Sequence, residues 1–108
     1  MPDFNDLLKT IKDDLLSLTQ ESLNEFKDEL IKDGSAFALK LQDDMLRWGE
    51  GLAGGLLTAS DIEFLIKAKK DLAEMEALKL AGLSKVKLEK LKNKIVETVI
   101  GSVVKVFA

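Results

Sequence analysis

The sequence has no cysteine, no histidine and no tyrosine. Thiolate and imidazole groups are the usual ligands of zinc, haem and iron–sulfur centres, and they supply many nucleophile–base pairs. Their absence excludes disulfides and metal sites of those kinds, and it leaves serine, threonine, lysine, arginine, aspartate and glutamate as the possible catalytic groups. We therefore expect a protein that is not an enzyme and that has no cofactor, no metal and no small-molecule substrate.

Helix-breaking residues are also scarce. The chain has one proline, and four of its seven glycines fall within residues 49–55. Breakers that are concentrated in this way favour long helices over many short strands. With 108 residues, of which 46% are hydrophobic, the chain is long enough for one core. We expect a single all-α domain over residues 1–108.

Long apolar runs are absent as well. The uncharged stretches at 51–60 and 98–104 are much shorter than the run of about 18 apolar residues that a membrane span requires. The first residues, "MPDFNDLLK", lack the basic-then-apolar order of a signal peptide. Together these features predict a cytoplasmic protein.

Apolar residues in the first third of the chain recur at steps of three and four, the period of an amphipathic helix. There is neither glycine nor proline between residues 3 and 33, and Gly34 supplies a C-terminal stop. The pattern predicts one long helix of about 46 Å, although the weak helix formers in residues 17–22 could break it. The apolar stripe consists of Phe4, Leu7, Leu8, Ile11, Leu15, Leu18, Leu23, Phe26, Leu30 and Ile31.

Three further helices complete an expected bundle of about four. Ser35 predicts the start of the second helix, which would end in the glycine-rich stretch 49–55. Ser60 and Glu63 stand at capping-box spacing for the third, which would continue to the turn before Ser84, the predicted cap of the fourth. The fourth segment is rich in β-branched residues. If this segment were a strand, it would have no other strand in the chain to pair with, so we predict a helix.

Two short patterns resemble catalytic or metal sites. Ser84 and Lys87 match S-x-x-K, but that chemistry needs further motifs and an oxyanion hole, so we interpret Ser84 as a helix cap. Glu21, Glu25 and Glu29 stand four residues apart and could hold a hard cation. Metal sites in helical bundles usually add histidine. A solvated acidic face is therefore the simpler interpretation.

Charge is distributed unevenly. Residues 1–33 hold nine acids and four bases, a net charge of −5, whereas residues 84–108 hold six lysines and two glutamates, a net charge of +4. This asymmetry could place the two ends of the chain side by side or set how copies associate. The predicted basic face consists of Lys85, Lys87, Lys90, Lys92 and Lys94. We expect no nucleic-acid partner, because the chain is acidic overall and has no aromatic residue among these lysines.

The C-terminal stretch, with its lysines and its apolar second half, has two interpretations. As a membrane anchor, its five lysines would contribute about 5 kcal/mol at an anionic surface. As a core helix, its apolar side chains would contribute at most about 12–24 kcal/mol, which matches or exceeds the net stability of about 5–15 kcal/mol expected for a whole domain. We therefore predict a core helix with a solvated basic rim.

These features predict a non-catalytic helical protein–protein interaction or assembly module. A first helix of about 46 Å could not be covered by helices of roughly 25–36 Å, so its surplus would be buried by a second copy or by another helical protein. The predicted interface residues are Phe26, Leu30, Ile31 and Trp48. The alternative is a membrane-surface or lipid-binding protein that uses the lysine-rich C-terminal helix.

Overall fold

The chain runs back and forth along one long axis in a computed structural model that describes residues 3–22 and 24–108. Over this part it forms six α-helices, two short 3₁₀ helices and no strand. In order, the elements are α1 (Phe4–Ser22), η1 (Asn24–Phe26), α2 (Lys27–Lys40), α3 (Gln42–Ala53), α4 (Ala59–Lys67), η2 (Lys70–Leu72), α5 (Glu76–Leu80) and α6 (Lys85–Phe107). The all-α prediction is confirmed, but the described part contains more helices than the four predicted.

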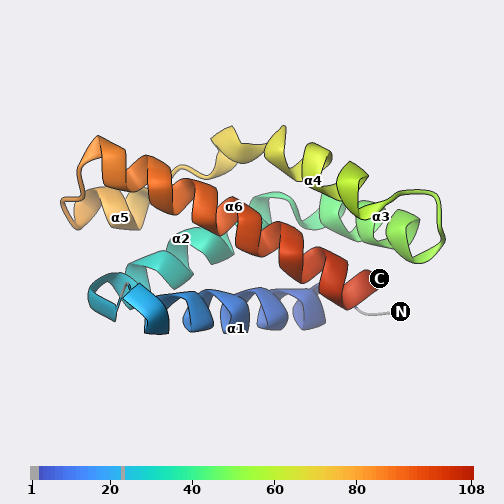
Figure 1. Cartoon of the computed structure of the whole chain (residues 1–108), viewed down its shortest axis with the longest axis horizontal. Helices are drawn as coiled ribbons and strands as arrows, with labels where there is room; N and C mark the ends of the chain where they lie inside the picture. The colour runs from blue at the N-terminus through green and yellow to red at the C-terminus, as the bar shows by residue number, and fades with distance from the viewer. Residues whose placement is uncertain (1–2, 23) are drawn as a thin grey trace.

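Helix α6 is the element around which α1, α2, α3 and α4 pack. Its 23 residues span about 34 Å, most of the 42 Å long axis of the molecule, and it contacts α1, α2, α3 and α4. Figure 1 shows α6 crossing the molecule from the end that holds α5 to the end where α1 begins and the C-terminus lies. The radius of gyration of 13.4 Å is close to the value of about 13 Å expected for one folded domain of this length. The chain therefore forms one globule.

The C-terminal segment is a core helix and not a strand. Leu91, Ile95, Val99, Val103 and Phe107 follow one another at steps of four along α6, and each is at most 5% exposed. They belong to the same apolar cluster as the buried residues of α1–α5. Because α1 packs directly against α6, the acidic N-terminal segment lies beside the basic segment 84–108. This is one of the two arrangements that the charge asymmetry suggested.

The long first helix predicted from the sequence does not form. The break between α1 and α2 follows the weak helix formers of residues 17–22, and α2 packs against α1. Gly34 lies buried inside α2, where a Cβ would collide with the Leu15 side chain of α1. Helix α2 continues through both positions, so the predicted stop at Gly34 and the predicted cap at Ser35 are wrong. The role of Gly34 is instead to permit the close approach of α1 and α2. Leu23 of the predicted stripe lies outside the described residues.

A second break, between α2 and α3, falls at Leu41, where the sequence has neither glycine nor proline. Leu41 is buried and adopts φ −103° and ψ 13°, outside the helical region. Helix α3 then continues through Gly49 and Gly51. The helix therefore ends at Ala53, within the glycine-rich stretch as predicted, and the loop begins at Gly54.

Helix α4 begins two residues earlier than the sequence suggested. Its cap is Thr58, whose Oγ1 accepts a hydrogen bond from the Asp61 N–H at 3.2 Å. The Thr58 N–H in turn donates to Asp61 Oδ2 at 2.9 Å. This is a capping box, so the box predicted for Ser60 and Glu63 is wrong in register although a cap of the same kind is present.

The third predicted helix is in fact three elements: α4, η2 and α5. Met75, just before α5, has φ 61° and is the one non-glycine residue with positive φ in the described part of the chain. Gly82 ends α5 with φ 88°, as predicted. Ser84 then caps α6, as predicted, because its Oγ accepts a hydrogen bond from the Lys87 N–H at 3.3 Å.

Candidate functional site

The residues predicted to form an interface lie largely inside the monomer. Leu30 is fully buried and Trp48 is 7% exposed, whereas Phe26 and Ile31 are half-buried and pack against the core. The premise of a 46 Å helix with an uncovered surplus is wrong, since the chain folds back after α1 and covers this stripe itself. Self-association stays a prediction.

The five predicted lysines do not form one face of α6. Lys87, Lys90 and Lys94 line one cavity, whereas Lys85 and Lys92 line another on a different side of the helix. Their spacing explains this division, because residues three, four and seven positions apart share a helix face.

We call the first of these cavities the basic cleft. It has a volume of about 300 Å³ and lies between η1, the α5–α6 turn and the first half of α6. Its residues are Glu25, Phe26, Leu83, Lys87, Lys90, Leu91 and Lys94. Among them, Leu91 is buried, and Phe26 and Leu83 are half-buried against the core. The cleft therefore combines a recessed apolar floor with a rim of lysines.

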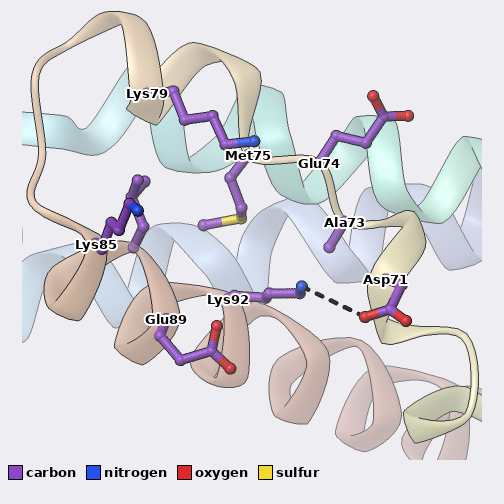
Figure 2. Close-up of a pocket in the computed structure, with 9 residues that line it drawn as sticks. Asp71, Ala73, Glu74, Met75, Lys79, Lys85, Glu89 and Lys92 are labelled. Atoms are coloured by element: carbon purple, nitrogen blue, oxygen red, sulfur yellow. Dashed lines mark ion pairs between the residues drawn. The ribbon is translucent and has the colours of Figure 1, made fainter.

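The second cavity, of about 400 Å³, lies between α6 and the segment that joins η2 to α5. Figure 2 shows Lys92 extended across it toward Asp71, with 3.8 Å between Nζ and Oδ1. Its lining residues are Asp71, Ala73, Glu74, Met75, Lys79, Lys85, Leu88, Glu89 and Lys92. Three lysines and three carboxylates line it, so their formal charges balance.

An ion pair between Lys40 and Glu74 ties α2 to the segment between η2 and α5. The Lys40 Nζ also donates a hydrogen bond to the backbone carbonyl oxygen of Leu72 at 3.1 Å. The hydrogen bond from Lys40, reinforced by its positive charge, lowers the pKa of Glu74 below its ordinary value. This carboxylate is exposed, so the pair fixes local geometry more than it stabilises the fold.

A polar cluster joins α1 to α6. The Ser102 Oγ lies 2.6 Å from Asp14 Oδ2, and the Lys105 Nζ lies 2.8 Å from Asp14 Oδ1. A serine near an acid and a lysine invites comparison with a nucleophile. Ser102, however, is fully buried, so no substrate reaches its hydroxyl. The cluster holds two helices together.

The candidate metal and nucleophile patterns do not assemble into sites. Glu21, Glu25 and Glu29 belong to α1, η1 and α2, so they do not share one helix face, and the side chain of Glu21 lies outside the described part. Within the residues that the structure places, no group of three or more acidic side chains could hold a metal ion. The Ser84 Oγ is occupied as the cap of α6.

Exposed apolar side chains form a feature that sequence reasoning missed. Leu80 is 90% exposed and Val86 is 68% exposed, and both flank the turn between α5 and α6. Leu56 and Phe64 are also exposed, in the α3–α4 loop and on α4. Val86 does not fall on the four-residue repeat of buried positions in α6. This mismatch is the sequence signal that could have identified Val86 as exposed.

None of the helices in residues 3–22 and 24–108 is long and apolar enough to cross a membrane. No protein-family model, curated protein or solved structure matches the chain.

Proposed function

We propose that this chain is a non-catalytic helical module that acts through protein–protein contact, either with a second copy or with another helical protein. Two serines that lie near lysine or carboxylate groups have structural roles, which favours a binding function. Ser84 caps α6, and Ser102 joins Asp14 in the tie between α1 and α6.

The observation that carries this proposal is the exposure of Leu80 and Val86 on either side of one short turn. Single exposed apolar residues are common, whereas a contiguous apolar patch bordered by polar groups is typical of an interaction site. The proposal therefore requires that one partner cover both Leu80 and Val86. Lys85 and Lys87 are exposed beside them at the start of α6. Burying Leu80 and Val86 against a partner would contribute about 3–6 kcal/mol at full burial.

Sedimentation of the chain at rising concentration tests self-association. We expect a mass above the 11.9 kDa of the monomer, and we expect Leu80→Ser/Val86→Ser to return it to monomer. The matched control is Leu56→Ser/Phe64→Ser, which removes two other exposed apolar side chains and should leave the mass unchanged. A wild-type chain that stays monomeric at the highest soluble concentration would exclude a second copy as the partner.

A membrane-surface function is the second candidate, and the composition of the same turn supports it. Apolar side chains that protrude beside lysines can enter the headgroup region of an anionic membrane. Co-sedimentation with vesicles tests this candidate. Binding to vesicles that contain phosphatidylserine, lost in Leu80→Ser/Val86→Ser, would favour the membrane over a protein partner.

A further inference from the structure

We propose that the basic cleft binds an acidic amphipathic helix of a protein partner. The inference rests on the proposed function and deepens it, since it names the chemistry that the partner presents. The partner would place a large apolar side chain on the floor of the cleft and direct carboxylates toward its lysine rim.

The floor of the cleft is shaped to receive an apolar side chain. Phe26 comes from η1, Leu83 from the α5–α6 turn and Leu91 from α6, so three separate segments converge on one cavity of about 300 Å³. Leu91 is buried and the other two are half-buried. A side chain that fills the cavity would remove apolar surface from water on both partners, which is favourable.

The charge of the rim selects an anionic partner. Three lysines and one carboxylate, that of Glu25, line the cleft. None of the ion pairs found among the described residues uses Lys87, Lys90 or Lys94. With respect to the described side chains, their ammonium groups are therefore available to a partner, in contrast to Lys92, which faces Asp71 in the neighbouring cavity.

The spacing of the lysines favours a helix. Lys87, Lys90 and Lys94 stand three and four residues apart and span about 10 Å along the axis of α6. Acidic residues three and four positions apart on a partner helix rise by the same amount, so a helix lying along α6 can meet all three lysines in register. This arrangement is helix-in-groove recognition, in which apolar anchors and charged flanks share one face.

The recessed floor argues against a membrane as the occupant of this cleft. A bilayer presents a broad surface and is entered by side chains that protrude, whereas Leu91 lies below the rim. The protruding residues, Leu80 and Val86, lie at the turn and not in the cleft. Vesicle binding is therefore the competing outcome and has to be measured alongside.

The test uses the full chain and a designed probe. The probe is an amphipathic peptide of about 18 residues, with leucine on one face and flanking glutamates, and its counterpart has every glutamate replaced by lysine. Isothermal titration calorimetry should detect the acidic peptide and not the basic one, with affinity falling as salt rises. Amide shifts in an NMR titration should map to residues 83–94.

The decisive variant is Lys90→Glu/Lys94→Glu, with Lys9→Glu/Lys12→Glu as its control. The control lysines are exposed on α1, and both variants change the net charge equally. We expect the cleft variant to weaken peptide binding about tenfold or more, equivalent to about 1.4 kcal/mol, and the control to change it by less than about twofold. Equal weakening by both variants, or an acidic peptide that does not bind, would overturn the inference.

Failure of this inference can be distinguished from failure of the proposed function. A chain that self-associates through Leu80 and Val86 but ignores the acidic peptide would overturn the cleft assignment alone. A chain that ignores the peptide and binds phosphatidylserine vesicles, with binding lost in Lys90→Glu/Lys94→Glu, would overturn both.

Discussion

The Asp33 carboxylate of α2 accepts a hydrogen bond from the Leu78 N–H of α5 at 2.9 Å, across 45 positions of sequence. Its other oxygen accepts from the Ala77 N–H, also at 2.9 Å. Met75, the N-cap position of α5, provides no side-chain cap and is left-handed. A helix as short as α5 is not stable alone. Asp33 of α2 supplies the N-terminal cap that the sequence of α5 lacks.

Replacing Asp33 should therefore destabilise the protein far more than replacing an exposed aspartate. We expect Asp33→Ala to lower the free energy of unfolding by about 2–3 kcal/mol, because one buried and one part-buried N–H group lose a charged acceptor. Urea unfolding measures the change, and hydrogen exchange at Ala77 and Leu78 should accelerate.

The control is Asp13→Ala, which removes an exposed aspartate of α1 and should change stability by less than about 0.5 kcal/mol. Similar effects of the two substitutions would show that the contacts between Asp33 and α5 contribute little.

Ser35→Ala distinguishes the observed fold from the sequence prediction by the sign of its effect. As an N-cap, Ser35 would stabilise its helix, and its loss would cost about 1 kcal/mol. In the structure Ser35 lies inside α2, and its Oγ is buried without a hydrogen-bond partner. We expect Ser35→Ala to raise the free energy of unfolding by about 0.5–1 kcal/mol, because alanine is the better helix former and leaves no unpaired hydroxyl. A loss of stability in thermal or urea unfolding would contradict this packing.

Two glycines inside helices should respond oppositely to alanine. A Cβ at Gly49 of α3 would lie 2.6 Å from the Phe107 ring of α6, so Gly49→Ala should cost about 1–3 kcal/mol. A Cβ at Gly101 of α6 would meet nothing within 4 Å, so Gly101→Ala should stabilise by about 0.5–1 kcal/mol. Melting temperatures of the two variants check the pair. A stabilising Gly49→Ala would contradict the close packing of α3 on α6.

The sequence predicted the fold class and the last helix because those features depend on local signals. The apolar stripe of α6 recurs every four residues, and Ser84 and Gly82 carry the cap and the turn that their residue types favour. The break at Leu41 has no such signal, since no breaker residue stands there. The break after α4 does have a signal in the sequence, because no large apolar residue lies between Ile66 and Leu72.

The candidate site was only partly predictable for a physical reason. The lysines of α6 were evident from the sequence, but their division between two cavities depends on where η1 and the α5–α6 turn pack against the helix. Phe26 was predicted at an interface as part of a helix stripe, whereas the structure places it on the floor of the basic cleft together with Leu83 and Leu91. Contacts between segments so distant in sequence have no local signature. The same holds for the capping of α5 by Asp33.

The Lys40–Glu74 pair makes a small part of the stability depend on acid pH. The pKa of Glu74 is lowered in the folded state, so the contribution of the pair is present above the ordinary glutamate pKa and is lost as pH falls through the lowered value. We expect Lys40→Met to move the pKa of Glu74 upward, toward its ordinary value of 4.5. An NMR titration of the Glu74 side chain measures this shift. The control Lys9→Met, on α1, should leave the titration unchanged, and a Glu74 pKa unaffected by Lys40→Met would contradict the pairing.

Removal of residues 95–108 should abolish cooperative unfolding instead of leaving a smaller stable bundle. The deletion removes five buried apolar side chains, worth about 8–15 kcal/mol at full burial, a range that rivals the whole expected stability of about 5–15 kcal/mol. These are Ile95, Val96, Val99, Val103 and Phe107. Replacing the exposed Lys85, Lys87, Lys90 and Lys94 with glutamine should by contrast cost less than about 1 kcal/mol each. Circular dichroism during urea unfolding checks both variants. A truncated chain that keeps a sharp transition would show that the second half of α6 is dispensable to the core.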